Sequence, residues 1–338
     1  MAQAHAEAYA DLPNVALVAA VDPSVERRDA FSDRFNIEHG FDNVEDLVEW
    51  GKFDAASNVT PDALHCRTTL PLLTAGKHVL CEKPLALTTE DADLMAQEAT
   101  AADVVNMVNL TYRNVPAVIE AAAMVRDGAI GTVRHFEASY LQSWLTQPAW
   151  GDWQTEQQWL WRLSSAHGSL GVLGDVGVHI LDMATHVAGA APRDVSCRLT
   201  TFDKAPGGRI GEYVLDANDS FNMHVELLNG AVGVVHASRM ASGHHNDLRL
   251  RIYGSTGGLE VRWEKNESIL RACVGTDMAE PNWTAIAAPD VKTNYVRFVD
   301  AIAQRQKVLP DFAHGAVLQH ALTAAVASDA AQGAIQPV

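Results

Sequence analysis

Short apolar segments alternate with amphipathic ones along the first third of the chain. Apolar runs at residues 15–21, 54–59, 77–81 and 104–110 predict strands, and the segments between them have the spacing of helices. The first run is continuously apolar, so we expect that strand to be buried on both faces. Ser24 can cap a helix over Val25–Phe35, and Gly76 can end a later one. Strands that alternate with helices predict a parallel sheet built from βαβ units.

The pattern changes after Tyr112 and Arg113, where strand-like runs begin to follow one another. Asn229-Gly230 lies between two of these runs and is typical of a hairpin turn. The runs occupy residues 132–141, 195–202, 220–228, 231–238, 248–253 and 258–263, with helices expected at 116–127, 176–187, 294–304 and 315–330. We therefore expect an α/β domain over residues 1–113. An α+β domain with a large, mainly antiparallel sheet should follow over residues 114–338.

Composition narrows the possible partners and the compartment. The 338 residues include 42 acidic and 25 basic side chains, a formal net charge of −17, which disfavours nucleic acid and anionic membrane surfaces as partners. The four cysteines are irregularly spaced, as expected of free thiols in a reducing compartment. Neither a signal peptide nor a membrane-spanning run is evident, so we expect a cytoplasmic protein.

Asp22 is the first candidate site residue, because it follows the apolar run at 15–21. In a dinucleotide-binding βαβ unit, an acidic residue about 20 positions beyond the glycine-rich loop binds the ribose hydroxyls. Ala2 would then occupy the position of the third small residue of that loop. The alternative is that Asp22 only initiates a turn before Pro23.

Lys83 is the second candidate, in the segment Cys81-Glu82-Lys83-Pro84-Leu85 that follows the strand at 77–81. The carboxyl ends of parallel strands are where α/β sheets bind ligands, and a residue before proline is held extended. Lys83 could therefore present an ammonium group over a ligand. An exposed turn is the alternative.

Asp175 and His179 form the third candidate, one helical turn apart, with Asp182 on the same side of the expected helix. A histidine beside a carboxylate can serve as an acid/base pair, since the imidazole takes up a proton near neutral pH. A purely structural role and metal ligation are the alternatives.

The segment 144–162 is the fourth candidate and holds five of the eight tryptophans. Indole rings such as that of Trp144 can stack on sugar or cyclitol rings, and Gln142 and Arg162 could add hydrogen bonds. Tryptophans buried by packing are the alternative.

Together these segments resemble the glucose–fructose oxidoreductase/inositol dehydrogenase (Gfo/Idh/MocA) family. The matching pieces run in the family's order through nearly the whole chain. They are Val21-Asp22, Asn58-Val59-Thr60-Pro61 with His65, residues 75–85, Tyr112-Arg113 with Pro116, residues 128–131, Gly174-Asp175 with Gly177, His179 and Asp182, and Tyr253-Gly254-Ser255 with Gly257.

The resemblance implies a Rossmann-type first domain and an NAD(P)-dependent oxidoreductase that acts on a ring hydroxyl or ketone of a sugar, cyclitol or anhydrosugar. Asp22 favours NAD over NADP, because its carboxylate repels a 2′-phosphate. The family's catalytic positions match Lys83, Asp175 and His179, and no metal is implied. The family's cofactor-binding positions match Ala2, Asp22, Thr60, Pro61, His65, Glu82 and Lys83, and the substrate positions match Tyr112, Gln142, Trp144 and Arg162. A homodimer or homotetramer is also implied.

The chain departs from the family where the first strand and the glycine loop are expected, because the sequence begins at Met1. We expect the neighbouring strand edges to be unpaired without that strand, and Met1 to be an internal methionine of a longer product. Two other functions remain open: a carbohydrate-sensing protein that has lost its nucleotide site, and a metal-dependent sugar isomerase or hydrolase.

Overall fold

The computed structural model describes residues 1–148 and 150–338 and divides them into two compact units. The first unit comprises Met1–Leu110 and Lys292–Gln319, and the second comprises Thr111–Val291 and His320–Val338. The chain thus leaves the first unit three residues before the predicted domain boundary at 113. It returns to that unit for residues 292–319, which the sequence pattern did not indicate.

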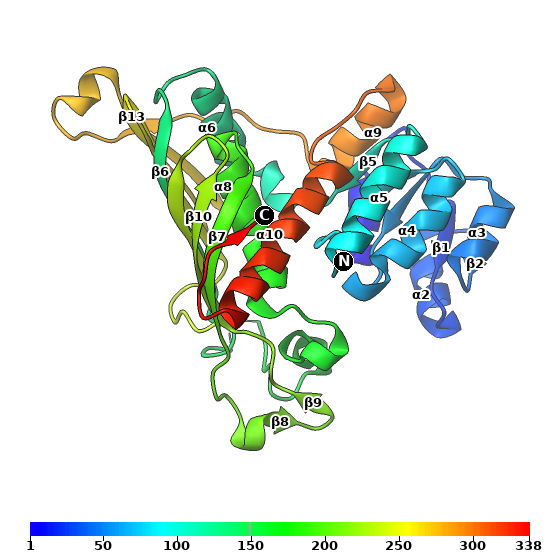
Figure 1. The fold of residues 1–338 in the computed structure, drawn as a ribbon. Helices are drawn as coiled ribbons and strands as arrows, with labels where there is room; N and C mark the ends of the chain where they lie inside the picture. The colour runs from blue at the N-terminus through cyan, green and yellow to red at the C-terminus, as the bar shows by residue number, and fades with distance from the viewer. Residues whose placement is uncertain (149) are drawn as a thin grey trace. The chain divides into compact units, whose positions relative to one another are not determined.

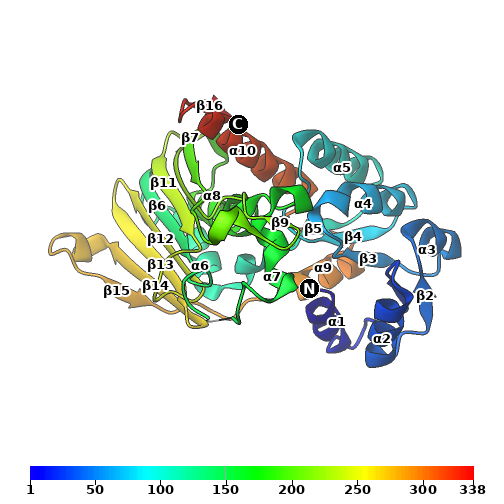
Figure 2. The same ribbon diagram turned by 90° about the horizontal axis from the view of Figure 1, so that it is seen from below.

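The first unit alternates strands and helices, and all of its strand pairs are parallel (Figures 1 and 2). Its elements are α1 (Ala2–Ala10), β1 (Ala19–Val21), α2 (Val25–Phe35), β2 (His39–Phe41), α3 (Val44–Trp50), β3 (Ala55–Asn58), α4 (His65–Thr74), β4 (His78–Cys81), α5 (Thr89–Ala101), β5 (Asn106–Val108), α9 (Asn294–Gln304) and the first part of α10 (Phe312–Ala330). Ser24 caps α2 by accepting a hydrogen bond from the backbone N–H of Arg27. The predicted Rossmann-type architecture is confirmed.

The parallel strands form two separate sheets, one of β1 and β2 and one in the order β3-β4-β5. Within the described residues β1 pairs with β2 alone, so one edge of β1 lacks a neighbouring strand. The expectation that this strand is buried on both faces is therefore wrong. Ala20 is buried, but Val21 is 41% exposed. The structure agrees with the expectation of unpaired strand edges at this place.

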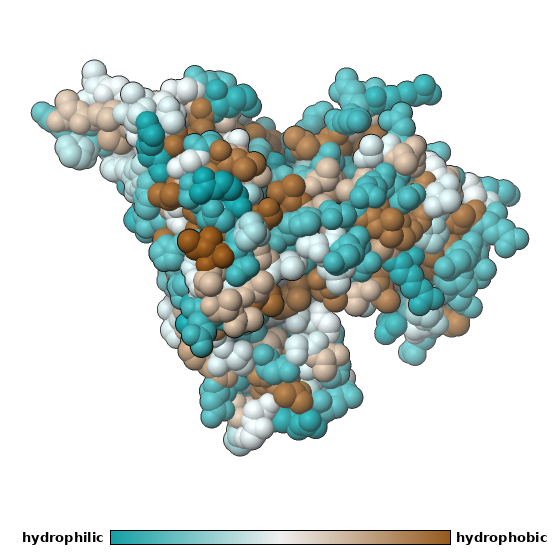
Figure 3. Space-filling view, in the orientation of Figure 1, coloured by the Kyte–Doolittle hydropathy of each residue, from teal (hydrophilic) through white to brown (hydrophobic). Residues whose placement is uncertain are grey.

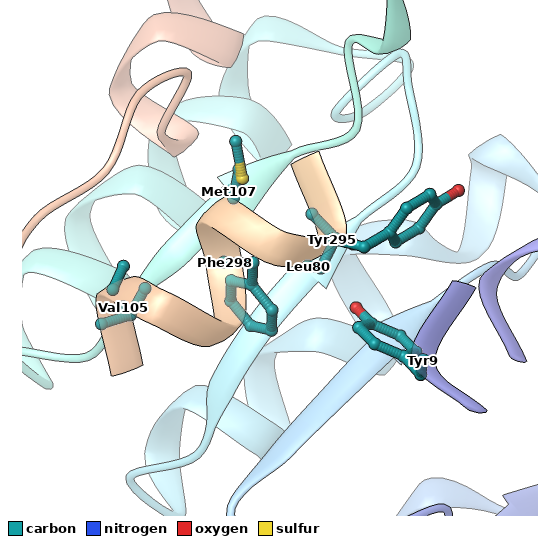
Figure 4. Close-up of a cluster of buried hydrophobic side chains, with 7 residues drawn as sticks. Tyr9, Leu80, Val105, Met107, Tyr295 and Phe298 are labelled. Carbon is teal, nitrogen blue, oxygen red and sulfur yellow. The ribbon is translucent and has the colours of Figure 1, made fainter. Parts of the chain in front are cut away.

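The core of the first unit explains why residues 292–319 belong to it. Tyr295 and Phe298 of α9 pack in one buried cluster with Leu80 of β4 and Met107 of β5 (Figure 4). Phe298 is 2% exposed, and burial of a side chain of this size contributes about 2–3 kcal/mol. The apolar face of α9 thus covers strands that lie about 200 residues earlier in the chain.

The second unit is built on a nine-stranded sheet in the order β15-β14-β13-β12-β6-β11-β10-β7-β16 (Figure 2). Its pairs are antiparallel except for β6 and β11, which run parallel. The elements are α6 (Pro116–Arg126), β6 (Val133–Leu141), α7 (Gln157–Leu160), α8 (Val178–Ala188), β7 (Pro192–Thr200), β8 (Arg209–Ile210), β9 (Tyr213–Val214), β10 (Ser220–Leu227), β11 (Val232–Ser238), β12 (Asp247–Gly254), β13 (Gly257–Glu264), β14 (Glu267–Val274), β15 (Thr284–Ile286) and β16 (Gln336–Pro337). The predicted α+β architecture is confirmed.

Helix α8 packs against the central strands β6, β11 and β12 of this sheet, and α6 packs against β13 and β14. Phe136 of β6 and Leu250 of β12 are fully buried beneath them. Gly177, just before α8, allows close packing, because a Cβ there would lie 2.8 Å from the ring of Phe221 on β10. The start of α8 is therefore held directly against the sheet.

Figure 3 shows one face of the molecule, on which hydrophilic residues in teal are interspersed with white and brown ones. None of the helices within residues 1–148 and 150–338 combines the length and the apolar character that are needed to cross a bilayer.

Candidate active site

Three strands of the second unit bring polar side chains to one end of the sheet. Tyr140 lies at the end of β6, Arg239 follows β11, and Asn246 precedes β12. In the registers, Leu141 is opposite both Ser238 and Asp247. Since β6 and β11 are parallel and β12 is antiparallel to β6, the ends of the first two strands meet the start of the third. The sheet thus gathers these side chains from segments about 100 residues apart.

Asp175 lies in a π-helical turn, Leu173–Gly177, that leads directly into α8. Such turns are rare and occur often at functional sites. Asn218 supports the turn, because its backbone oxygen accepts from Val172 N at 2.8 Å and its side chain accepts from Leu173 N at 3.0 Å. The expected helix over 176–187 therefore begins with a wider turn than predicted, and His179 lies in the first turn of α8.

Tyr112 lies beside both Asp175 and His179. Its ring meets the His179 ring edge-on, with centroids 5.1 Å apart and an interplanar angle of 88°. Burial raises the pKa of Tyr112 to about 12, and the nearby charge of Asp175 acts in the same direction, against the hydrogen bonds with Tyr140 and Asn246. Tyr112, Asp175 and His179 thus share one neighbourhood, and Tyr112 carries a neutral hydroxyl there.

A closed ring of hydrogen bonds joins Tyr112, Tyr140 and Asn246. Tyr140 donates to Asn246 Oδ1, and Asn246 Nδ2 donates to the Tyr112 oxygen at 2.8 Å. The Tyr112 hydroxyl is also hydrogen-bonded to that of Tyr140, and since Tyr140 already donates to Asn246, Tyr112 must be the donor. Each hydroxyl proton is therefore engaged within the ring.

Gln142 and Trp144 extend this ring. Gln142 Nε2 donates to Asn246 Oδ1 at 3.0 Å, and Trp144 Nε1 donates to Gln142 Oε1 at 3.2 Å. The structure thus joins three predicted substrate residues, Tyr112, Gln142 and Trp144. Asn246, which connects them, was not among the residues predicted from the sequence. Its position directly before a strand is the single signal that could have drawn attention to it.

The tryptophan-rich segment is held together largely by its own packing. Trp144 and Trp153 are 4% and 7% exposed and lie in one cluster with Leu160, Leu163 and Leu215. The alternative interpretation, in which the tryptophans are buried by packing, therefore accounts for Trp144 and Trp153. The Arg162 guanidinium lies over the rings of Trp159 and Trp161, at 5.3 and 4.6 Å from their centroids.

Asp182 is engaged in a buried ion pair. Arg113 donates to both of its carboxylate oxygens, from Nε at 2.8 Å and from NH2 at 2.6 Å. The side chains of Arg113 and Asp182 are 5% and 3% exposed. A two-point pair of this kind fixes the orientation of α8 through its own hydrogen bonds. In the described part of the chain, no three His, Cys, Asp or Glu side chains are grouped so that they could hold a metal ion.

In the first unit, Glu82 lies at the centre of a buried polar network. His5 Nε2 lies 2.8 Å from Glu82 Oε1, and Asn109 Nδ2 donates to the same oxygen at 2.7 Å. Burial alone would raise the pKa of Glu82, but hydrogen bonds from His5 and Asn109 and the charges of His5 and Lys83 lower it to about 2. Glu82 is therefore an ionised buried carboxylate directly before Lys83, whose backbone N–H it accepts at 3.3 Å.

His65 joins two loops of the first unit. It is fully buried, and its ring nitrogens lie 2.9 Å from the backbone oxygens of Thr60 and Pro84. Thr60 and Pro61 follow β3, and Glu82 and Lys83 follow β4, so both loops leave the carboxyl edge of the same parallel sheet. That edge is where such sheets bind ligands. His65 therefore connects the two loops and fixes their positions through these two contacts.

Asp22 follows β1 with its carboxylate partly exposed. Its Oδ1 accepts from the backbone N–H of Ser24 at 2.8 Å and from Arg27 at 3.1 Å. Ala2 begins α1, and the N-terminus of a helix favours phosphate groups. Donors and acceptors of these kinds can bind hydroxyl and phosphate groups of a ligand.

Two family models match the chain. The model described as "Oxidoreductase family, NAD-binding Rossmann fold" covers residues 1–110, and the model of the GFO/IDH/MocA C-terminal domain covers residues 118–260. The first match therefore lies within the first unit and the second match within the second unit, on either side of the boundary at residue 111.

Similar proteins include a levoglucosan dehydrogenase from Pseudarthrobacter phenanthrenivorans, 28% identical over 303 residues, which are 83% of this chain and 75% of that protein. A scyllo-inositol 2-dehydrogenase (NADP(+)) from Bacillus subtilis is 33% identical over 189 residues, about half of each chain (56% and 55%). The solved structure of a levoglucosan dehydrogenase in complex with NADH has a TM-score of 0.87 and 26% identity, and the alignment covers 100% of this chain and 96% of that one.

Proposed function

The chain belongs to the Gfo/Idh/MocA family of oxidoreductases, and we propose from this that it transfers a hydride between NAD and a ring carbon of a sugar, anhydrosugar or cyclitol. The observation that carries the proposal is the grouping of Asp175, His179 and Tyr112 at one end of the large sheet. Polar side chains that can hold several hydroxyl groups adjoin these three residues. The named relatives act on substrates of this kind.

NAD is the cofactor, and it supplies the hydride acceptor when bound. Asp22 would hold the ribose hydroxyls, and the start of α1 at Ala2 would favour the phosphates. Thr60 and Pro61 would contact the cofactor beyond the carboxyl end of β3. Glu82 and His65 would act indirectly, because they fix the backbone of the loops that carry Lys83 and Thr60.

In the oxidation direction, His179 would accept the proton of the substrate hydroxyl while the hydride leaves the same carbon, so that a ketone forms. Lys83 would hold the reacting oxygen and stabilise its developing negative charge. Asp175 would orient the substrate through a neighbouring hydroxyl and favour the protonated form of His179. Tyr112, Gln142 and Arg162 would select the ring, and the buried Trp144 would act through its hydrogen bond to Gln142.

The direct test is NADH binding to the purified chain, followed through energy transfer from tryptophan to nicotinamide. NADH formation with a panel of anhydrosugars, aldoses and inositols should then be measured. We expect saturable binding and turnover of at least one member of the panel. A folded protein that binds NADH yet oxidises none of these compounds would contradict the proposed reaction.

The same assay tests the roles of His179 and Lys83. His179→Ala and Lys83→Ala should each lower kcat by at least about a hundredfold. Lys307→Ala, an exposed lysine on the same unit as Lys83, is the matched control and should leave kcat unchanged. Near-normal turnover of either active-site variant would exclude the role assigned to that residue.

We also propose that copies of the chain associate through the open face of the large sheet. Arg249, Arg251 and Glu260 project from the face opposite to α6 and α8, where Glu260 accepts from Arg249 Nε at 2.8 Å and Glu137 from Arg251 at 2.6 Å. Such an ordered charged surface suits a second copy of itself. Light scattering during gel filtration should give a dimer or tetramer mass, and a monomer would exclude this.

A cytoplasmic location is part of the same proposal. All four cysteines are free thiols, as is usual in reducing compartments. Cell fractionation with an antibody against the chain would test this location, and recovery outside the cytoplasm would contradict it.

A further inference from the structure

Arg239 is the largest of the fully buried side chains in the described structure, and its guanidinium contacts three parts of the candidate site. NH2 donates to Asp175 Oδ2 at 2.9 Å, and NH1 donates to the backbone oxygen of Arg162 at 3.1 Å. The guanidinium carbon lies 5.1 Å from the centre of the Trp144 ring. One side chain therefore touches the carboxylate, the loop that carries Arg162 and the ring of Trp144.

A buried guanidinium is costly unless a negative charge lies beside it. A second carboxylate that acts on Arg239 is that of Asp219, which is fully buried. Asp219, however, already forms an ion pair with Lys204 at 2.6 Å and accepts the Phe202 N–H at 2.9 Å. Asp175 is therefore the carboxylate that directly neutralises Arg239.

The two members of the pair differ in exposure. The side chain of Arg239 is 0% exposed, whereas that of Asp175 is 30% exposed. A charge-assisted hydrogen bond from a rigid, buried donor fixes a carboxylate more firmly than solvent does. The rigid member of the pair is therefore the arginine, and the exposed surface of the pair belongs to the carboxylate that would meet a substrate.

We infer that Arg239 is a positioning residue for the reaction. It holds the Asp175 carboxylate in a fixed orientation and sets its place relative to Trp144 and the Arg162 backbone. This inference rests on the proposed function, because its effect is exerted on the carboxylate that orients the substrate. Arg239 itself makes no contact with substrate in this role.

The inference predicts that the effects of Arg239 and Asp175 are not independent. Asp175→Asn should lower kcat about a hundredfold, and Arg239→Gln about thirtyfold with the Kd for NADH unchanged. The double variant should be no slower than Asp175→Asn alone, because the arginine acts through the carboxylate. Arg126→Gln is the matched control, since it removes an arginine from an exposed pair with Asp127 and should leave kcat within twofold.

Arg239→Lys guards against a folding defect, because it keeps the buried charge. A lysine presents one compact ammonium and cannot reproduce the planar fork that contacts both Asp175 and Arg162. We expect it to lower kcat about tenfold in the native background and by less than twofold in the Asp175→Asn background. Thermal unfolding of each variant shows that the assays are made on folded protein.

Four results overturn the assignment. Losses that multiply in the double variants would mean that Arg239 acts independently of Asp175, and a rise in KM without a fall in kcat would mean that it only anchors the loop. Turnover of Arg239→Gln within threefold of wild type would exclude any role. A wild-type enzyme that oxidises no sugar would overturn the proposed function and this assignment together, so the two failures are distinguishable.

Discussion

His5 Nε2 lies 2.8 Å from Glu82 Oε1, and the two residues are 2% and 6% exposed. The pair joins the first helix of the chain to the loop that carries Lys83. Asn109, which follows β5, donates to Glu82 Oε1 at 2.7 Å, and its Nδ2 also donates to the hydroxyl oxygen of Tyr295 on α9 at 3.2 Å. Four segments of the first unit thus meet at one carboxylate.

This carboxylate should make the stability of the protein depend on acid pH. The pKa of Glu82 is lowered to about 2 in the folded chain, below its ordinary value of 4.5. The stabilisation is therefore fully present above about pH 4.5 and is lost as the pH falls towards 2. It amounts to roughly 3 kcal/mol for a shift of this size.

Glu82→Gln removes the ionised form at every pH. Urea unfolding should show that the variant is much less stable than wild type at pH 7 and close to it near pH 2. Glu90→Gln, at an exposed position on α5, is the control. A difference between Glu82→Gln and wild type that is the same at both pH values would contradict the assignment.

Asp182 should behave as a structural residue despite its place beside His179 in the sequence motif. Removing one partner of a buried ion pair costs about 3–5 kcal/mol, so Asp182→Asn should lower the free energy of unfolding by this amount. Its kcat at low temperature should stay within a few-fold of wild type, because Asp182 is bound to Arg113. The exposed pair gives the comparison: Asp127→Asn should cost less than about 1 kcal/mol. A hundredfold loss of kcat in Asp182→Asn would show that the residue takes part in the reaction.

Tyr112→Phe isolates the contribution of the hydrogen-bonded ring. The variant keeps the edge-on contact with His179 but deprives Asn246 and Tyr140 of a partner. A buried group left without a hydrogen bond costs about 1–3 kcal/mol, so we expect a stability loss of that order. We also expect KM for the sugar to rise about tenfold while kcat changes little. A selective loss of kcat would instead place the Tyr112 hydroxyl among the groups that move a proton.

Asp22 should determine the choice between NAD and NADP. Asp22→Ala removes the charge that repels a 2′-phosphate and releases Arg27, which is paired with it at 3.1 Å. The ratio of kcat/KM for NADP to that for NAD should increase at least about tenfold. Asp29→Ala, on α2 and paired with Arg28, removes an exposed carboxylate nearby and should leave the ratio unchanged. An unchanged ratio in Asp22→Ala would mean that another residue discriminates between the cofactors.

Local patterns in the sequence predicted most of the helices and strands, but they did not predict how distant strands pair. Capping and periodicity placed α2 over Val25–Phe35 and α9 over Asn294–Gln304, as observed. The short strand His39–Phe41 was missed, because its three residues include histidine and glycine and show no apolar run. The parallel pairing of β6 with β11 was also missed, since local patterns carry no information about distant partners.

The candidate site shows the same division. Asp175 and His179 were found because they share one short motif on one helix. Arg239 and Asn246 were not found, since neither belongs to a recognisable sequence motif. They come together only because the ends of β6 and β11 meet the start of β12. Their hydrogen bonds to Asp175 and Tyr112 depend on tertiary structure.

The return of residues 292–319 to the first unit has a consequence for synthesis of the chain. Tyr295 and Phe298 complete the cluster around Leu80 and Met107, yet they leave the ribosome about 180 residues after Leu110. At about 5–20 residues per second, the nascent first unit must wait roughly 10–40 seconds with an apolar surface uncovered. The second unit can fold most of its sheet during this delay. The amino-terminal unit therefore begins to fold first but completes its core late. The nascent chain most needs protection by a chaperone during this interval.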